Sequence, residues 1–171
     1  MLDDVIGEIP LPQPSGDWLG DLRAIALASY EIYRAHRWIV LLGIQPGLGP
    51  NTRRFGAVAL RVFDPLDVDL STRINVLAAL NNYIFGFIHR ELAWEQLRER
   101  SGLNDEQWDV RLQAHLEAAS EQDASLAREM AERFTLVSRE SFEFGLECLL
   151  DGVAASIARR QRPEASRRSA S

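Results

Sequence analysis

Apolar residues recur at helical spacing along almost the whole chain, and no alternating strand pattern persists beyond a few residues. This pattern predicts an all-α, multi-helix bundle. The expected helices cover residues 2–8, 17–37, 50–63, 71–100, 104–119, 123–134 and 138–160. A short apolar stretch, Trp38–Gln45, is expected to continue the second helix or to kink away from it. The segment that follows is rich in Gly and Pro and predicts a turn.

The expected helix ends have local chemical signals. Side chains that accept hydrogen bonds from free backbone amides are favoured just before a helix, and Pro is tolerated at its first position. The start signals are Ser15 or Asp17 for the helix over 17–37, Pro50 for that over 50–63, Asn104 with Gln107 as a capping box, and Ser138 for the last helix. Ser101-Gly102 is expected to end the longest helix.

The longest expected helix, residues 71–100, has two apolar stripes. A helix that is apolar on two sides is buried on two sides, so one side can face the domain core and the other a partner. Asn81 and Asn82 interrupt its apolar run. Asn81 is expected to form a hydrogen bond across a helix interface, whereas Asn82 is equally consistent with that role and with a ligand cavity.

The last helix has apolar residues at spacings of four, three, four and four, from Phe142 to Ile157, which is typical of a helix-packing stripe. Gly145 and Gly152 lie on the same side, and Gly86 lies within the longest helix. Glycine inside a helix costs about 1 kcal/mol relative to alanine, so close approach of another helix is expected there. The pattern favours dimerisation, with an ordinary core contact as the alternative. The expected interface residues are Ile84, Ile88, Phe142, Gly145, Leu146, Leu149 and Val153.

Composition narrows the function. The 171 residues suffice for one domain, expected over residues 1–160, with a disordered Arg/Ser-rich tail over 161–171. The formal net charge of −6 argues against nucleic-acid binding by the domain as a whole. A single cysteine, Cys148, excludes an internal disulfide and a Cys-rich zinc site, and it suits a reducing cytoplasm. No apolar run reaches the roughly 18 residues that span a bilayer, so no membrane association is expected.

Catalytic motifs are absent from the sequence. His36, His89 and His115 lie on three different expected helices, and none belongs to a known metal-binding or nucleophile motif. Glu91 lies two residues from His89, so the two side chains point in different directions on a helix. We therefore expect no catalytic residue, no metal and no cofactor. A small metal-dependent helical enzyme built around His36 or His89 is the less favoured alternative.

Several short motifs, in this order, resemble the C-terminal domain of TetR/AcrR transcription regulators, specifically the tetracycline-repressor type. They are Asp17-Trp18 opening a helix, His36-x-Trp38, Leu48-Gly49-Pro50-Asn51, the Gly86 helix with Glu91, and Phe142-x-x-Gly145-Leu146 followed by Asp151-Gly152. The resemblance extends from Met1 to about Ala158. It implies an all-α domain that pairs with its twin through a four-helix bundle and binds a small molecule between its other helices.

The resemblance also implies a repressor-type regulator whose DNA binding is released or altered by an effector. Positions that hold the drug in the prototype fall on Ile25, Ser29 and Leu41, which favours a hydrophobic or aromatic effector. The expected ligand-binding residues are Ile25, Ser29, Trp38, Phe55, Leu60, Asn82, Phe85 and His89. The family's N-terminal helix-turn-helix has no counterpart in these residues, so DNA binding is expected only through such a segment. The alternative is a homodimeric interaction module that lacks the helix-turn-helix and titrates a full-length regulator.

Overall fold

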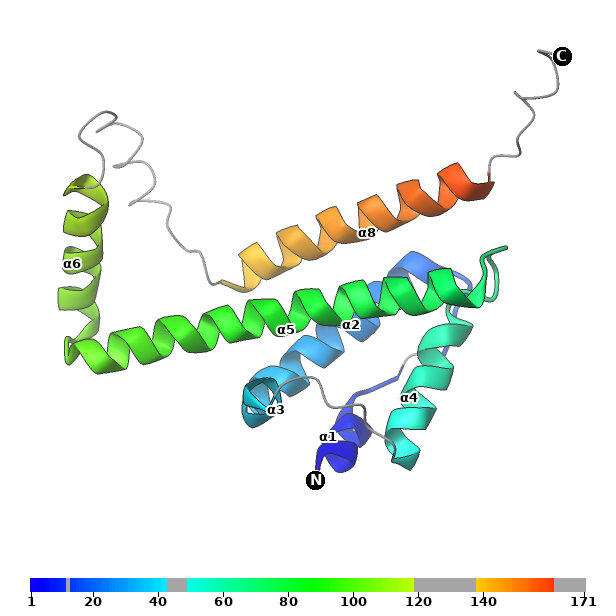
Figure 1. Cartoon of the computed structure of the whole chain (residues 1–171), viewed down its shortest axis with the longest axis horizontal. Coiled ribbons are helices and arrows are strands. Elements are labelled where there is room, and N and C mark those ends of the chain that lie inside the picture. Colours follow the sequence, from blue (N-terminus) through cyan, green and yellow to red (C-terminus); the bar gives the residue numbers. More distant parts are fainter. Residues whose placement is uncertain (12, 43–48, 119–137, 162–171) are drawn as a thin grey trace, which may run out of the picture. The chain divides into compact units, whose positions relative to one another are not determined.

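The computed structural model describes residues 1–11, 13–42, 49–118 and 138–161 of the chain (Figure 1). All regular secondary structure in these ranges is α-helical, which confirms the fold class. The helices are α1 (Leu2–Glu8), α2 (Trp18–Ala35), α3 (Trp38–Leu41), α4 (Pro50–Arg61), α5 (Leu70–Ser101), α6 (Asp105–Ala118) and α8 (Arg139–Gln161). The helix expected over 123–134 and the tail expected over 161–171, apart from Gln161, lie outside the described residues.

The helices group into two compact units. The first contains residues 1–89 and 143–171, and the second contains residues 90–142. The long helix α5 contributes to both, since it passes from one unit to the other at His89. Whether the chain acts as the single domain expected over 1–160 stays a prediction.

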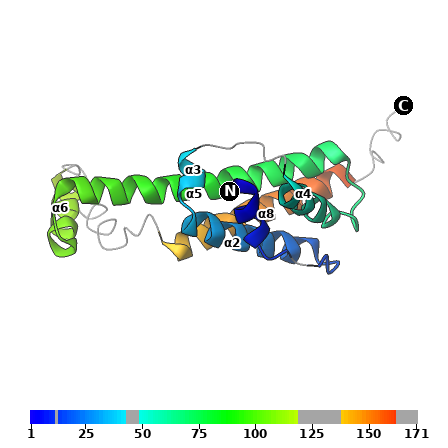
Figure 2. The same ribbon diagram turned by 90° about the horizontal axis from the view of Figure 1, so that it is seen from below.

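The core of the first unit forms where α2, α5 and α8 meet. Tyr30 of α2 packs edge-on against Phe87 of α5, with ring centroids 6.1 Å apart. Arg23 of α2 forms a two-pronged ion pair with Glu147 of α8. These contacts place α2 beside both long helices (Figure 2). The fully buried side chains of this unit include Leu22, Tyr30, Val62, Phe63, Ile88, Leu146 and Leu150.

The two long helices of this unit run antiparallel, side by side (Figure 1). Tyr83 of α5 lies against Gly145 near the start of α8, while Thr72 near the start of α5 accepts a hydrogen bond from Arg160 near the end of α8. A Cβ atom added at Gly145 would overlap the Tyr83 hydroxyl. The close approach expected at Gly145 therefore exists within the chain, and a side chain rather than a helix backbone makes it.

Most helix ends follow the local signals in the sequence. The Asp17 side chain accepts a hydrogen bond from the Gly20 amide at 3.1 Å, and the Ser138 hydroxyl accepts one from the Ser141 amide at 3.1 Å. The start of α5 differs slightly from expectation, because Asp69 accepts a hydrogen bond from the Thr72 amide at 2.6 Å. Hydrogen bonds from Thr72 lower the pKa of Asp69 below its ordinary value.

Helix α1 caps the start of α4. The Asp3 carboxylate accepts hydrogen bonds from the Asn51 amide at 3.2 Å and from both the amide and the hydroxyl of Thr52 at 2.8 Å. These bonds satisfy amides that a helix start leaves free. The Thr52 amide bond is the main cause that lowers the pKa of Asp3. At the other end of α1, Glu8 lies 3.0 Å from His36, the residue that ends α2.

The second unit contains the turn between α5 and α6. Gly102 follows the end of α5 with a φ of 66°, a left-handed conformation that glycine adopts at little cost. Asn104 and Gln107 then exchange backbone-to-side-chain hydrogen bonds at 2.9 and 3.1 Å, which confirms the capping box. Trp94 of α5 packs edge-on against Trp108 of α6, with ring centroids 6.3 Å apart. The contact closes this helical hairpin with a pair of large apolar side chains.

Candidate functional site

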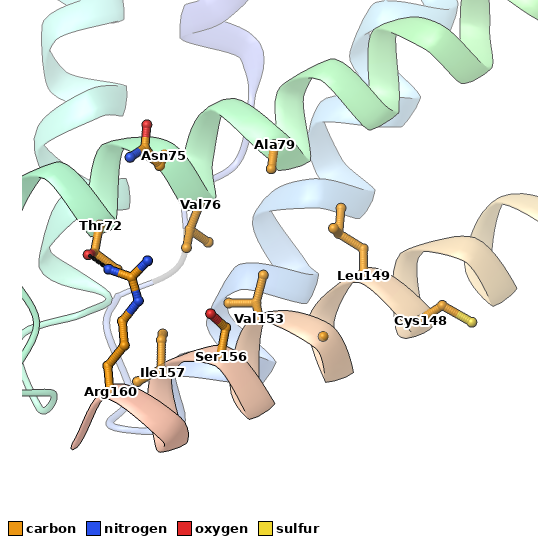
Figure 3. A pocket seen from close by; sticks show the side chains of 11 residues that line it. Thr72, Asn75, Val76, Ala79, Cys148, Leu149, Val153, Ser156, Ile157 and Arg160 are labelled. Carbon is orange, nitrogen blue, oxygen red and sulfur yellow. Dashed lines mark hydrogen bonds between the residues drawn. The ribbon is translucent and has the colours of Figure 1, made fainter. Parts of the chain in front are cut away.

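A surface groove lies between α5 and α8 in the first unit, with a cavity volume of about 300 Å³ (Figure 3). Its lining residues come from four positions of α5 and seven of α8. They are Thr72, Asn75, Val76 and Ala79 of α5, and Cys148, Leu149, Gly152, Val153, Ser156, Ile157 and Arg160 of α8.

The groove is apolar along most of its length and cationic at one end. Figure 3 shows Leu149 and Val153 of α8 pointing toward α5, where they lie beside Val76 and Ala79. Arg160 reaches across the end of the groove and donates a hydrogen bond to the Thr72 hydroxyl at 3.2 Å. Such a surface suits another apolar surface or an amphipathic molecule, and it offers no pair of acid and base groups for catalysis.

A stripe of mostly small, exposed residues runs along each side of the groove. We call the two stripes together the outer face, and its residues are Asn75, Ala79, Asn82 and Gly86 of α5 and Phe144, Cys148, Gly152 and Ala155 of α8. Successive members are three or four residues apart, so each stripe lies on one side of its helix. A Cβ atom added at Gly86 or Gly152 meets no atom within 4 Å. Both glycines are therefore open among the residues that the structure describes.

The structure separates the residues expected at a dimer interface. Five of them are buried within the chain's own fold, namely Ile84, Ile88, Phe142, Leu146 and Val153. Leu149 is half-buried, and both Leu149 and Val153 line the groove. The side chain of Tyr83 fills the space beside Gly145. Of the seven residues expected at the interface, Leu149 and Val153 line a groove that a second molecule could reach directly.

The residues expected to bind a ligand fall into two groups, six that are buried or half-buried and two that are exposed. Ile25 and Ser29 are buried on α2, while Trp38, Phe55, Leu60 and Phe85 are half-buried on α3, α4 and α5. The remaining two, Asn82 and His89, are exposed on α5, and Asn82 belongs to the outer face. The structure therefore does not bring Asn82 and His89 together with the buried pair on α2.

Phe85, one of the half-buried residues, takes part in an aromatic contact between α5 and α2. Tyr33 of α2 packs edge-on against Phe85 of α5, with ring centroids 5.0 Å apart. Burial raises the pKa of Tyr33 to about 12, because the phenolate form would lose its hydration. The Tyr33 phenol is therefore neutral in an apolar, aromatic environment at ordinary pH.

The described residues contain neither a metal-binding cluster nor a membrane-spanning helix. Over residues 1–11, 13–42, 49–118 and 138–161, no three or more His, Cys, Asp or Glu side chains gather in a way that could hold a metal ion. Among the same helices, none is long and apolar enough to cross a membrane. The thiol of Cys148 is free and exposed.

Comparison with known proteins gives a consistent family and fold. The family described as "Tetracyclin repressor-like, C-terminal domain" matches residues 10–157. The HTH-type transcriptional repressor DrrR1 of Streptomyces coeruleorubidus is 24% identical over 165 residues, covering 94% of this chain. The chain spans only 61% of that relative's length.

The TetR family protein ActR of Streptomyces coelicolor is similar in structure. Its complex with actinorhodin superposes with a TM-score of 0.69 at 19% identity, covering 91% of this chain and 73% of ActR. Apo ActR gives a TM-score of 0.69 at 18% identity, covering 92% of this chain and 72% of ActR. At this level of identity the likeness shows the fold.

Proposed function

This chain belongs to the tetracyclin repressor-like C-terminal domain family, and we propose that it is the effector-binding, homodimerising domain of a repressor-type transcription regulator. Any DNA binding would reside in a helix-turn-helix segment outside these residues. The effector is proposed to be a small hydrophobic or aromatic molecule that releases or alters DNA binding.

The observation that supports dimerisation best is the outer face. It combines exposed small residues, an exposed Phe144 and a groove of about 300 Å³ on two adjacent long helices. Small residues allow two helix pairs to approach closely, and four-helix packing of this kind needs interaxial distances of about 8–10 Å. We therefore place the proposed dimer interface on the outer face and at Leu149, beside the buried residues that the sequence pattern suggested.

The effector site is proposed on the inner side of α2 to α5. Its residues are Ile25, Ser29, Trp38, Phe55, Leu60 and Phe85, whereas Asn82 and His89 are left out because they are exposed. Ser29 is buried and polar, and the other five proposed residues are apolar or aromatic, which is the usual make-up of a small-molecule site. The neutral Tyr33 phenol beside Phe85 fits the same apolar character.

Helix α1 offers a physical route from such a site to a preceding segment. Asp3 holds α1 on the start of α4, and Glu8 holds it on His36 at the end of α2. A ligand that shifts α2, α3 or α4 would move the groups to which α1 is attached. Because the effector and DNA sites are separate, the coupling would be allosteric in the two-site sense.

Two measurements test the proposal. Light scattering after size exclusion should give twice the mass of one chain, and a monomer at tens of micromolar would contradict homodimerisation. A thermal-shift screen with hydrophobic and aromatic compounds tests the effector site. A ligand at 100 times its Kd adds about 2.7 kcal/mol, which corresponds to a rise in Tm of roughly 5–11 °C at this chain length.

A pair of variants makes the screen specific. Phe85→Ala should reduce the shift given by the best compound, whereas Val110→Ala should leave it unchanged, because Val110 is 63% exposed and lies in the other unit. Equal shifts in Phe85→Ala and the wild-type protein would place the effector elsewhere.

A further inference from the structure

Helix α1 and the first turn of α4 stabilise each other across 49 residues of sequence. We call α1 together with residues 50–53 the strap. We infer that the strap opens and closes as one unit: α1 detaches and the first turn of α4 unravels in the same step, while the rest of the first unit stays folded. Neither a second copy nor an effector is needed for this step.

On the α1 side, the helix is too short to be stable by itself. It has seven residues, Leu2–Glu8, whereas isolated helices shorter than about 12–15 residues are marginal in water. Its start has no side-chain cap, and Gly7 inside it lowers its helix propensity further. Val5 and Ile6 are buried, and so is Ile9 directly after the helix. Docking of these apolar side chains is therefore what keeps α1 helical.

On the α4 side, the first turn depends on α1. Gly49, the residue before the helix, has no side chain that accepts a hydrogen bond from the free amides, and Pro50 follows it. The acceptor comes from α1, because Asp3 accepts hydrogen bonds from the Asn51 amide at 3.2 Å and the Thr52 amide at 2.8 Å. A helix start that loses such an acceptor is less stable. Since the coupling acts in both directions, a disturbance at the start of α4 frees α1, and a pull on α1 unravels the start of α4.

Two glycines let the halves of the strap approach closely. A Cβ atom added at Gly49 would overlap the Asp3 carboxylate, and one added at Gly7 would lie 2.7 Å from the side-chain nitrogen of Asn51. The missing Cβ atoms thus leave the space in which these two side chains lie. Figure 1 shows α1 next to the start of α4. The contact is therefore shaped from both sides.

The attachment of α1 to α2 is weaker. Pro10 ends α1, because the second residue before it is the last that helical geometry allows without strain. The chain is tied back to α2 only at Ser15, whose amide and hydroxyl donate hydrogen bonds to Asp21 at 2.8 and 2.9 Å. Glu8 and His36 are 3.0 Å apart, but their side chains are 51% and 31% exposed, and such pairs contribute little. Helix α1 can therefore leave while α2 keeps its own start.

Amide exchange in the intact 171-residue chain, followed by NMR, tests whether the two halves of the strap open together. Two amides serve as reporters. The Val5 amide donates to the Met1 carbonyl within α1, and the Arg53 amide donates to the Gly49 carbonyl at the start of α4. Both acceptors are backbone carbonyls, so each reporter keeps its hydrogen-bond acceptor when a side chain is changed. One shared opening should give both amides the same protection.

Substitutions at the two ends of α1 should change both reporters together. Asp3→Ala should speed exchange of Val5 and Arg53 by about tenfold, the effect of a lost helix cap. Asp4→Ala removes an acid from the same turn but leaves the cap, so about twofold or less is expected. Glu8→Ala, at the other end of α1, should speed both by about two- to fivefold. An effect of Glu8→Ala on Val5 alone, or of Asp3→Ala on α4 alone, would overturn the shared opening.

A pair of glycine substitutions tests the fit. Gly49→Ala should act like Asp3→Ala, because the new Cβ displaces the carboxylate, and it should add little in the Asp3→Ala background. Gly56→Ala is the matched control in the same helix. No described atom lies within 4 Å of a Cβ there, so this change should slow exchange at Arg53. Effects of Gly49→Ala and Asp3→Ala that multiply would contradict the fit.

The Leu150 amide of α8 shows whether the rest of the unit stays folded. It should exchange more slowly than both reporters, and at an unchanged rate in Glu8→Ala and Asp3→Ala. If Leu150 accelerates by the same factor as Val5 and Arg53, α1 opens only when the whole unit unfolds. That result would overturn the detachable strap.

Discussion

Leu146 and Leu149 lie three residues apart on α8, and the sequence pattern assigned both to a dimer interface. In the structure Leu146 is fully buried, whereas Leu149 is half-buried at the groove. The substitution Leu146→Ala should therefore destabilise the fold of each chain. The matched substitution Leu149→Ala removes the same atoms from a surface position.

The size of the effect follows from burial. Leu146→Ala removes three carbon groups, which costs about 2.4 kcal/mol in transfer free energy. Phe142 and Leu150 are equally buried one turn on either side, so the surroundings can collapse only in part. The remaining cavity raises the expected loss to about 3–5 kcal/mol. This is a large share of the roughly 5–15 kcal/mol that stabilises a typical domain.

Urea denaturation followed by circular dichroism, at two protein concentrations, measures the loss. We expect a cost of about 3–5 kcal/mol for Leu146→Ala at both concentrations and about 1 kcal/mol or less for Leu149→Ala in the monomer. Dimer contacts make stability depend on concentration, whereas core contacts do not. A cost below 1 kcal/mol, or one that falls as protein concentration rises, would contradict the burial of Leu146 in the core of its own chain.

Three smaller predictions concern ionisable groups. Burial raises the pKa of Tyr33 from 10.0 to about 12, so the stability it contributes is present below pH 10 and is lost as the pH rises through 12; ultraviolet titration should find a tyrosine that ionises late in the wild-type chain and is missing in Tyr33→Phe. Replacing Asp3 with Ala should speed hydrogen exchange at the Thr52 amide, and because hydrogen bonds lower the pKa of Asp3, the native cap should weaken only as the pH falls through that lowered value. Arg23→Met should cost less than about 1 kcal/mol in urea, because both Arg23 and Glu147 are nearly half exposed and the pair is screened; a loss above 2 kcal/mol would contradict this.

Local chemistry explains which parts of the fold the sequence could predict. The caps at Asp17, Asn104 and Ser138 involve residues within three positions of each other, so their signals are readable without the fold. The cap of α4 is different, because its acceptor, Asp3, lies 49 residues before Thr52. No spacing rule connects them. Only the packing of α1 on α4 shows that this acidic residue has a structural role.

The proposed interface was harder to predict than the helices. Periodicity shows which residues share a side of a helix, but it does not show what covers that side. Ile84, Ile88 and Leu146 have the spacing of an interface, and the chain buries them itself. Phe144 lies off that stripe. Its apolar side chain alone does not show whether it is exposed or covered.

The three glycines singled out within helices show the same limit and its physical meaning. Each glycine costs its helix about 1 kcal/mol relative to alanine. The close approach of another element was expected to offset that cost. At Gly145 the approaching group is Tyr83 of the same chain, so the cost is offset within one molecule. At Gly86 and Gly152, no atom of the residues that the structure describes lies within 4 Å of the missing Cβ. The proposed second copy on the outer face would supply the contact that offsets the cost of these two glycines.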